Sequence, residues 1–180
     1  MGTFIRLGWR ERAHALLAYF MGDRRPAAWN QWAEVVGRDP RKSRFVGDMP
    51  HGWIASDFIR ATLDLFAYER DDRSLVLAAG VLPDWLAGGG IAIKNLRTPY
   101  GRLSYWLQKN GERVRLHVAS GVQLPPGGIA FVWPGNENPG ATRINGKAAL
   151  WRGNELRIAE LPADVTVDLQ NSPTGNATPR

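Results

Sequence analysis

His51 precedes the third of three predicted helices, within the segment of residues 48–53. Imidazole titrates near neutral pH, so a histidine at a helix end can exchange a proton or hydrogen-bond a hydroxyl group. Trp53 adds a flat apolar face, and Asp48 and Asp57 supply carboxylates nearby in the sequence. We therefore take His51 and Trp53 as candidate substrate-binding residues. The alternative is that His51 serves only as a helix cap.

Trp29 and Trp32 are three residues apart in a segment with helical spacing. Residues three apart share one face of a helix, so the two indoles are expected side by side. They are candidate walls of a sugar subsite, because an indole offers a broad apolar face to a ligand. The alternative, which the spacing alone favours, is that both lie in the core.

Carboxylates matter if the chemistry is glycoside hydrolysis, which needs one acid and one base on either side of the scissile bond. Asp48 lies in a predicted loop, and Asp57 lies in an otherwise apolar helix where we expect it to be buried. Glu34, Asp64 and Glu69 are further carboxylates in the same part of the chain. Spacing alone does not select a pair.

No cofactor or metal site is expected from the sequence. His14, His51 and His117 lack the spacing of metal ligands, and the chain contains no cysteine. The glycines at 88–90 are not followed by the Lys-Ser/Thr of a phosphate-binding loop. The Gly-x-Ser-x-Gly motif of a serine hydrolase is also absent from the sequence.

The formal net charge of +6 and the pI near 10.2 raise the question of nucleic-acid binding. The charge is spread along the chain: residues 1–73 hold 12 basic and 10 acidic residues, and residues 74–180 hold 11 and 7. The sequence also contains no apolar run long enough to span a membrane. We therefore expect neither a nucleic-acid nor a membrane partner.

The periodicity of apolar residues changes near residue 72. Helical spacing predicts helices over 9–22, 26–36 and 53–69, the third of them largely buried. After residue 72, short apolar runs between turn residues predict strands at 74–81, 91–96, 103–107, 114–118, 122–124, 129–133, 143–144 with 147–151, 155–158 and 165–169. The predicted fold class is α+β, with a helical segment followed by an antiparallel β-sandwich.

The predicted organisation is a helical part over 1–72, a β-sandwich over 73–170 and a flexible tail over 171–180. Three helices with broad apolar faces form a poor domain by themselves, because a small unit buries too little of its surface. The helical part therefore requires a larger partner structure.

Several short motifs follow one another in a fixed order. They are the Trp29/Trp32 pair, Pro50-His51-Gly52, Thr98-Pro99-Tyr100-Gly101, Trp106, Leu124-Pro125-Pro126-Gly127, Trp133-Pro134 and Asn145-Gly146. Over residues 10–170 this order resembles the C-terminal third of the α-L-rhamnosidase-like six-hairpin glycosidases. The resemblance implies that residues 1–72 are the last helices of an (α/α)6 barrel, and that a C-terminal β-sandwich follows them.

In that family a Trp-Glu-x-Trp motif carries the general base, and the matching position in this chain is Asn30. An amide cannot accept a proton from water as a carboxylate does. The base is then Asp48 or Asp57, or the protein is inactive, or it is not a rhamnosidase. The resemblance places the general acid upstream in the barrel, so the isolated chain is expected to be inactive.

Three functional hypotheses follow. In the first, the chain is the C-terminal fragment of a glycoside hydrolase-like protein that binds a carbohydrate at His51, Trp53, Trp29 and Trp32. In the second, the sandwich is a non-catalytic carbohydrate-binding module that uses Tyr100, Tyr105 or Trp106. In the third, the chain is a structural or nucleic-acid-binding protein. The segment around Arg6 to Arg12 is too charged for a signal peptide, although the resemblance implies that full-length relatives are exported.

Overall fold

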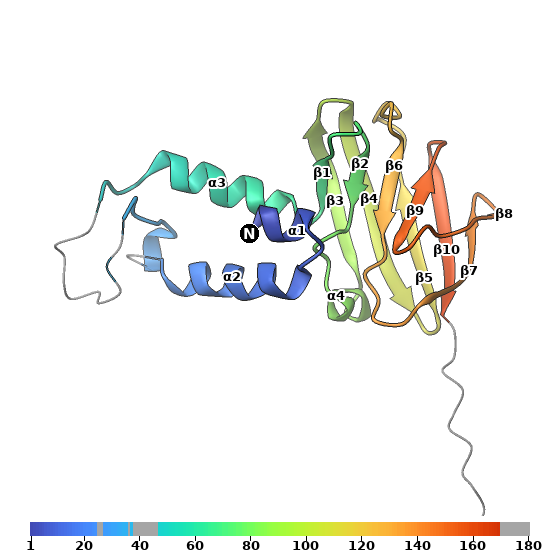
Figure 1. The fold of residues 1–180 in the computed structure, drawn as a ribbon, viewed down its shortest axis with the longest axis horizontal. Coiled ribbons are helices and arrows are strands. Elements are labelled where there is room, and N and C mark those ends of the chain that lie inside the picture. Colours follow the sequence, from blue (N-terminus) through green and yellow to red (C-terminus); the bar gives the residue numbers. More distant parts are fainter. Residues whose placement is uncertain (25–26, 36, 38–46, 170–180) are drawn as a thin grey trace, which may run out of the picture. The chain divides into compact units, whose positions relative to one another are not determined.

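The computed structural model describes residues 1–24, 27–35, 37 and 47–169 (Figure 1). The chain divides into two compact units, Met1–Tyr68 and Glu69–Arg180. Helices dominate the first unit, and the strands of the second form two sheets. The fold is α+β with a β-sandwich-like arrangement, in agreement with the predicted class. Pro26, Val36 and the predicted tail over 171–180 lie outside the described residues.

The helical unit contains four elements: α1 (Gly2–Arg6), α2 (Arg10–Gly22), the 3₁₀ helix η1 (Ala27–Trp29) and α3 (Gly52–Leu63). Within this unit α2 and α3 lie roughly antiparallel (Figure 1). Arg6 of α1 contacts two of the residues that follow α3. Its guanidinium lies 3.2 Å from the carboxylate of Asp64 and 4.4 Å from the ring centroid of Tyr68.

The helix predicted over 26–36 is wrong in its described part. Only the single 3₁₀ turn Ala27–Trp29 forms, and Asn30 then has a φ of 54°. This left-handed conformation ends a right-handed helix, and asparagine tolerates it better than most residues. Trp29 and Trp32 therefore do not share a helix face: Trp29 is 60% exposed and Trp32 is 7% exposed.

The third predicted helix is shorter and more exposed than the sequence indicates. α3 ends at Leu63, and none of its residues is buried. Residues Ala67–Glu69 form strand β1 instead, because they join a sheet with β2 (Leu75–Leu77). The last residues of the predicted helix thus belong to a strand. Over so few residues, the apolar pattern of a strand cannot be told from that of a buried helix end.

The second unit contains two sheets whose strands lie one over the other in Figure 1. One sheet has the order β1-β2-β6-β9, where β6 is Ile129–Val132 and β9 is Glu155–Ile158. The other has the order β3-β4-β5-β10-β7-β8. Its strands are β3 (Ile91–Thr98), β4 (Gly101–Asn110), β5 (Arg113–Val118), β7 (Pro139–Ile144), β8 (Lys147–Ala148) and β10 (Ala163–Leu169).

Antiparallel pairing dominates the two sheets. The six-stranded sheet is antiparallel at every described pair, whereas β2 and β6 of the smaller sheet run parallel. A parallel pair needs a long connection, and the chain between β2 and β6 supplies it by passing through α4 (Pro83–Ala87) and the β3–β5 meander.

The core lies between the sheets. Alternate residues of the larger sheet are buried, as the period of two of a strand requires: Leu103, Tyr105, Leu107, Val114, Leu116, Val118, Ala163, Val165 and Val167. β2 and β6 of the smaller sheet are buried along their whole length. Next to them, Trp133 and Trp151 pack edge to face, with ring centroids 5.5 Å apart.

Local turn chemistry is the best-predicted part of the sandwich. Asn110-Gly111 joins β4 to β5, Asn145-Gly146 joins β7 to β8, and the turn at 98–101 joins β3 to β4. Pro83 lies in the first turn of the short helix α4, where its fixed φ suits the start of a helix. The strand predicted at 122–124 is reduced to a single bridge between Gly101 and Val122.

Candidate functional site

The helical unit contains a hollow of about 260 Å³ that is mostly apolar. The described residues that line it are Met1, Phe20, Trp32, Ile54, Asp57, Phe58 and Ala61. Two of the residues predicted from the sequence, Trp32 and Asp57, therefore meet at one place. They come from segments 25 residues apart in the chain, the loop after η1 and the middle of α3.

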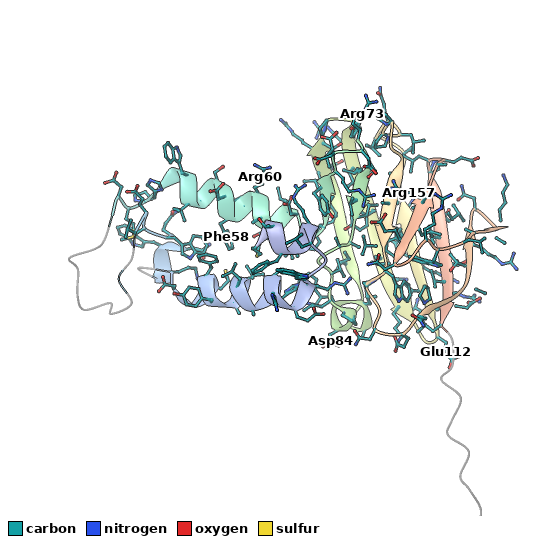
Figure 2. The ribbon with its side chains drawn as sticks, viewed as in Figure 1. Phe58, Arg60, Arg73, Asp84, Glu112 and Arg157 are labelled. Carbon is teal, nitrogen blue, oxygen red and sulfur yellow. The ribbon has the colours of Figure 1, made fainter. Side chains whose placement is uncertain are left out.

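Trp32 lines this hollow, and two contacts hold its indole in place. Its indole Nε1 donates a hydrogen bond of 2.7 Å to the carbonyl oxygen of Phe20, at the end of α2. Its ring packs on that of Phe58, with centroids 4.3 Å apart and planes 33° apart. Figure 2 shows the Phe58 side chain on the side of α3 that faces α2. Trp32 thereby contacts both of the longer helices, and its ring gives the hollow an aromatic surface of fixed orientation.

Asp57 differs from the expectation that it is buried: it is exposed on α3. It lines both the apolar hollow and a second, more polar hollow of about 350 Å³. Arg6, Arg60 and Asp64 also line the second hollow, and Arg6 is paired with Asp64 there. Asp57 thus stands where an apolar aromatic surface meets charged groups, an arrangement that suits a ligand with one apolar and one polar side.

His51 is the N-cap of α3, which confirms the alternative role considered for it. Its Nδ1 accepts a hydrogen bond of 3.4 Å from the backbone N–H of Ile54. Its ring lies edge to face with that of Trp53, with centroids 5.9 Å apart. Trp53 is 81% exposed. A sugar-binding role for these two residues stays a prediction, and they do not line the hollow at Trp32.

The remaining predicted site residues also lie outside that hollow. Asn30 accepts a hydrogen bond of 2.6 Å from Nη1 of Arg24. The carbonyl oxygen of Asp48 accepts a hydrogen bond from the backbone N–H of Glu34. Trp29 is exposed. The predicted residues that the structure describes therefore form two pairs, Trp32 with Asp57 and His51 with Trp53. They do not form one larger site.

Sequence reasoning missed Phe20, Ile54 and Phe58 as parts of the hollow. Their apolar side chains at helical spacing look like ordinary core residues in the sequence. A buried indole commonly packs against another aromatic ring, so an aromatic partner for Trp32 could have been expected. Nothing in the sequence pairs Phe58 with Trp32 across 25 intervening residues.

The three aromatic residues of the sandwich that were considered for sugar binding differ in exposure and in their contacts. Tyr105 is 2% exposed, so it is excluded as a surface contact, and burial raises the pKa of its phenol. The hydroxyl of Tyr100 donates a hydrogen bond to the carboxylate of Glu69, which raises the pKa of Tyr100. Trp106 is 36% exposed on the outer face of the larger sheet. Trp106 is therefore the best placed of the three for an external ligand.

Charged side chains form a network on the smaller sheet. Arg70 lies 2.6 Å from Glu155 and 3.3 Å from Asp72, and Arg157 lies 3.2 Å from Asp72. Hydrogen bonds from the Ser74 hydroxyl and backbone N–H, and then from the two arginines, lower the pKa of Asp72. Figure 2 marks Arg157 on this sheet. Each charge has an opposite partner, so the network is best explained as structural.

Within the described ranges, no helix is both long enough and apolar enough to cross a membrane. The same residues contain no group of three or more His, Asp or Glu side chains that could hold a metal ion. Comparisons of the chain with protein-family models, with curated proteins and with solved structures find no match. The functional argument therefore depends on the geometry of the sites themselves.

Proposed function

We propose that the chain is the C-terminal part of a glycoside hydrolase-like, carbohydrate-active protein. In this proposal the helical unit is the end of an (α/α)6 barrel and supplies part of the sugar cleft, and the β-sandwich braces the barrel. The observation that carries the proposal is the hollow where the rings of Trp32 and Phe58 meet the carboxylate of Asp57. Aromatic faces suit the C–H side of a sugar ring, and a carboxylate suits its hydroxyl groups.

The exposed surface of the helical unit supports the barrel part of the proposal. Large apolar side chains that are at least 40% exposed occur throughout this unit: Leu7, Trp9, Tyr19, Trp29, Val35, Trp53, Ile59 and Leu63. A soluble protein seldom leaves so many large apolar groups in water within one small region. Further helices of a barrel would cover such a surface, and the covering helices would close the cleft around Trp32.

The proposed chemistry needs a second carboxylate. Asp57 is the described acidic residue at the apolar hollow, and it is proposed as the general base or as a hydrogen-bond acceptor for a sugar hydroxyl. Asp48 is the second candidate for the base. Hydrolysis of a glycosidic bond also requires an acid on the other side of the bond, which the rest of the barrel would supply. The chain alone is then expected to be inactive.

The proposal is tested on the native polypeptide, enriched from the producing cells with an antibody against this chain. A panel of aryl glycosides that includes an α-L-rhamnoside is the substrate, and the isolated 180-residue chain is assayed beside it. We expect hydrolysis by the native polypeptide and none by the isolated chain. Asp57→Asn in the native gene should lower kcat at least about 10²-fold if Asp57 is the base.

Asp71→Asn is the matched control, since Asp71 is an exposed carboxylate outside the helical unit. It should leave hydrolysis unchanged. If Asp48→Asn abolishes activity and Asp57→Asn does not, the base is Asp48. Absence of hydrolysis of every glycoside by the native polypeptide would contradict the enzymatic proposal.

A further inference from the structure

A row of outward-facing side chains crosses four neighbouring strands of the larger sheet. The strand register places Ala92 of β3 opposite Trp106 of β4, Trp106 opposite His117 of β5, and His117 opposite Asp164 of β10. The neighbouring positions along these strands point into the core, so this row lies on the outer face of the sheet.

The indole of Trp106 is held in a fixed orientation within this row. Its ring is stacked with that of His117, with centroids 5.8 Å apart and planes 20° apart. His117 is held in turn, since its Nδ1 lies 2.7 Å from a carboxylate oxygen of Asp164. On the other side, the facing residue is the small Ala92, and Trp106 is 36% exposed. The result is a preorganised aromatic surface, which loses little conformational entropy when a ligand binds.

A second row beside the first carries polar groups that are free to bind a ligand. Gln108 of β4 lies opposite Arg115 of β5, and Arg115 lies opposite Thr166 of β10. Arg115 is exposed and forms no ion pair with any described residue. Its neighbour Arg113, by contrast, is paired with Asp168 at 2.6 Å. An unpaired guanidinium two residues from the stack can form a bidentate contact with a carboxylate.

We propose that this face binds an acidic polysaccharide, with a sugar ring stacked on Trp106 and a sugar carboxylate bound by Arg115. Single-stranded nucleic acid also stacks on aromatic rings, but such sites combine several aromatic residues with a positively charged groove. Here one indole stands in a row that ends in the carboxylate of Asp164. The single stacking position favours the sugar. This inference is independent of the proposed cleft in the helical unit.

The test is affinity electrophoresis of the full chain in gels that contain polygalacturonate or its methyl ester. Polygalacturonate should retard the chain, and the methyl ester should retard it less because it lacks the charge. Trp106→Ala should weaken retention by polygalacturonate at least about tenfold. Arg115→Gln should remove the preference for the charged polymer over its ester. Circular dichroism confirms that each variant is folded.

Two matched variants serve as controls. Trp9→Ala removes another exposed indole, in the helical unit, and Arg152→Gln removes another exposed arginine. Both should bind like the unchanged chain. The proposal is overturned if polygalacturonate does not retard the chain, if Trp106→Ala binds normally, or if a single-stranded oligonucleotide binds through Trp106 more tightly than polygalacturonate.

Discussion

At the scale of single residues, Asp72 combines several stabilising contacts in the sandwich. Its carboxylate accepts hydrogen bonds from the hydroxyl and backbone N–H of Ser74 and lies next to two arginines. The ionised form is favoured in the folded state, so the pKa lies below its ordinary value of 3.8. This stabilisation is therefore fully present above about pH 4 and is lost as the pH falls towards the lowered pKa.

Asp72→Asn should lower the free energy of unfolding by about 1 kcal/mol at pH 7, a modest value because nearly half of the side chain is in water. The difference from the unchanged chain should shrink between pH 4 and pH 2, because the Asp72 carboxylate binds a proton there in the unfolded chain, whereas the folded chain keeps it ionised. Urea unfolding over that pH range measures it. Asp71→Asn is the control and should show no such trend; a pH-independent effect of Asp72→Asn would contradict the account.

Thr142 accepts a hydrogen bond of 2.8 Å from the indole Nε1 of Trp151, next to the aromatic cluster of the core. Thr142→Val keeps the shape of the side chain but leaves the indole N–H without this partner, which should cost about 1–2 kcal/mol of stability. In a Trp151→Phe background the same change should cost less, because no N–H is left to satisfy. Equal costs in both backgrounds, measured by urea unfolding, would show that the hydrogen bond contributes nothing.

At the scale of elements, Gly90 determines how closely β3 can approach β4. Its φ is +82°, and a Cβ atom there would lie 2.3 Å from the carbonyl oxygen of Leu107. Gly90→Ala should therefore lower the free energy of unfolding by about 2 kcal/mol or more, through overpacking and backbone strain. Gly88→Ala is the matched control, since nothing lies within 4 Å of its Cβ position. Similar melting temperatures for the two variants would contradict this explanation.

The elements that local chemistry determines could be predicted from the sequence. Asn110-Gly111 and Asn145-Gly146 both mark hairpin turns, and Pro83 marks the start of α4. Elements that depend on distant partners could not be predicted. Residues 67–69 become a strand only because β2 lies beside them, and the buried Ala67 and Tyr68 equally suit a helix.

The candidate site illustrates the same limit. Trp32 and Asp57 were identified by residue type, because an indole and a carboxylate suit sugar binding. Their meeting at one hollow depends on the ring contact with Phe58 and on the turn that Asn30 makes with a left-handed backbone. The expected helix would have placed Trp32 beside Trp29 instead. Sequence periodicity carries no information about such long-range contacts.

At the scale of the whole molecule, the two units differ in how well they bury their apolar residues. The sandwich packs alternate residues of its larger sheet into a continuous core. Among the residues that the structure describes, the helical unit leaves eight large apolar side chains at least 40% exposed, and α3 has no buried residue. This contrast is the physical basis for the central claim that the helical unit is the end of a larger helical domain.

The mass of the native protein tests that claim most directly. An antibody raised against residues 74–180 is used to probe an immunoblot of the producing cells, with the 20.0 kDa chain as the size standard. The account predicts a band several times larger than the standard, since the proposed barrel would precede the sandwich. A band at 20.0 kDa would contradict it, and the sheet face at Trp106 would then become the leading candidate for the function of the chain.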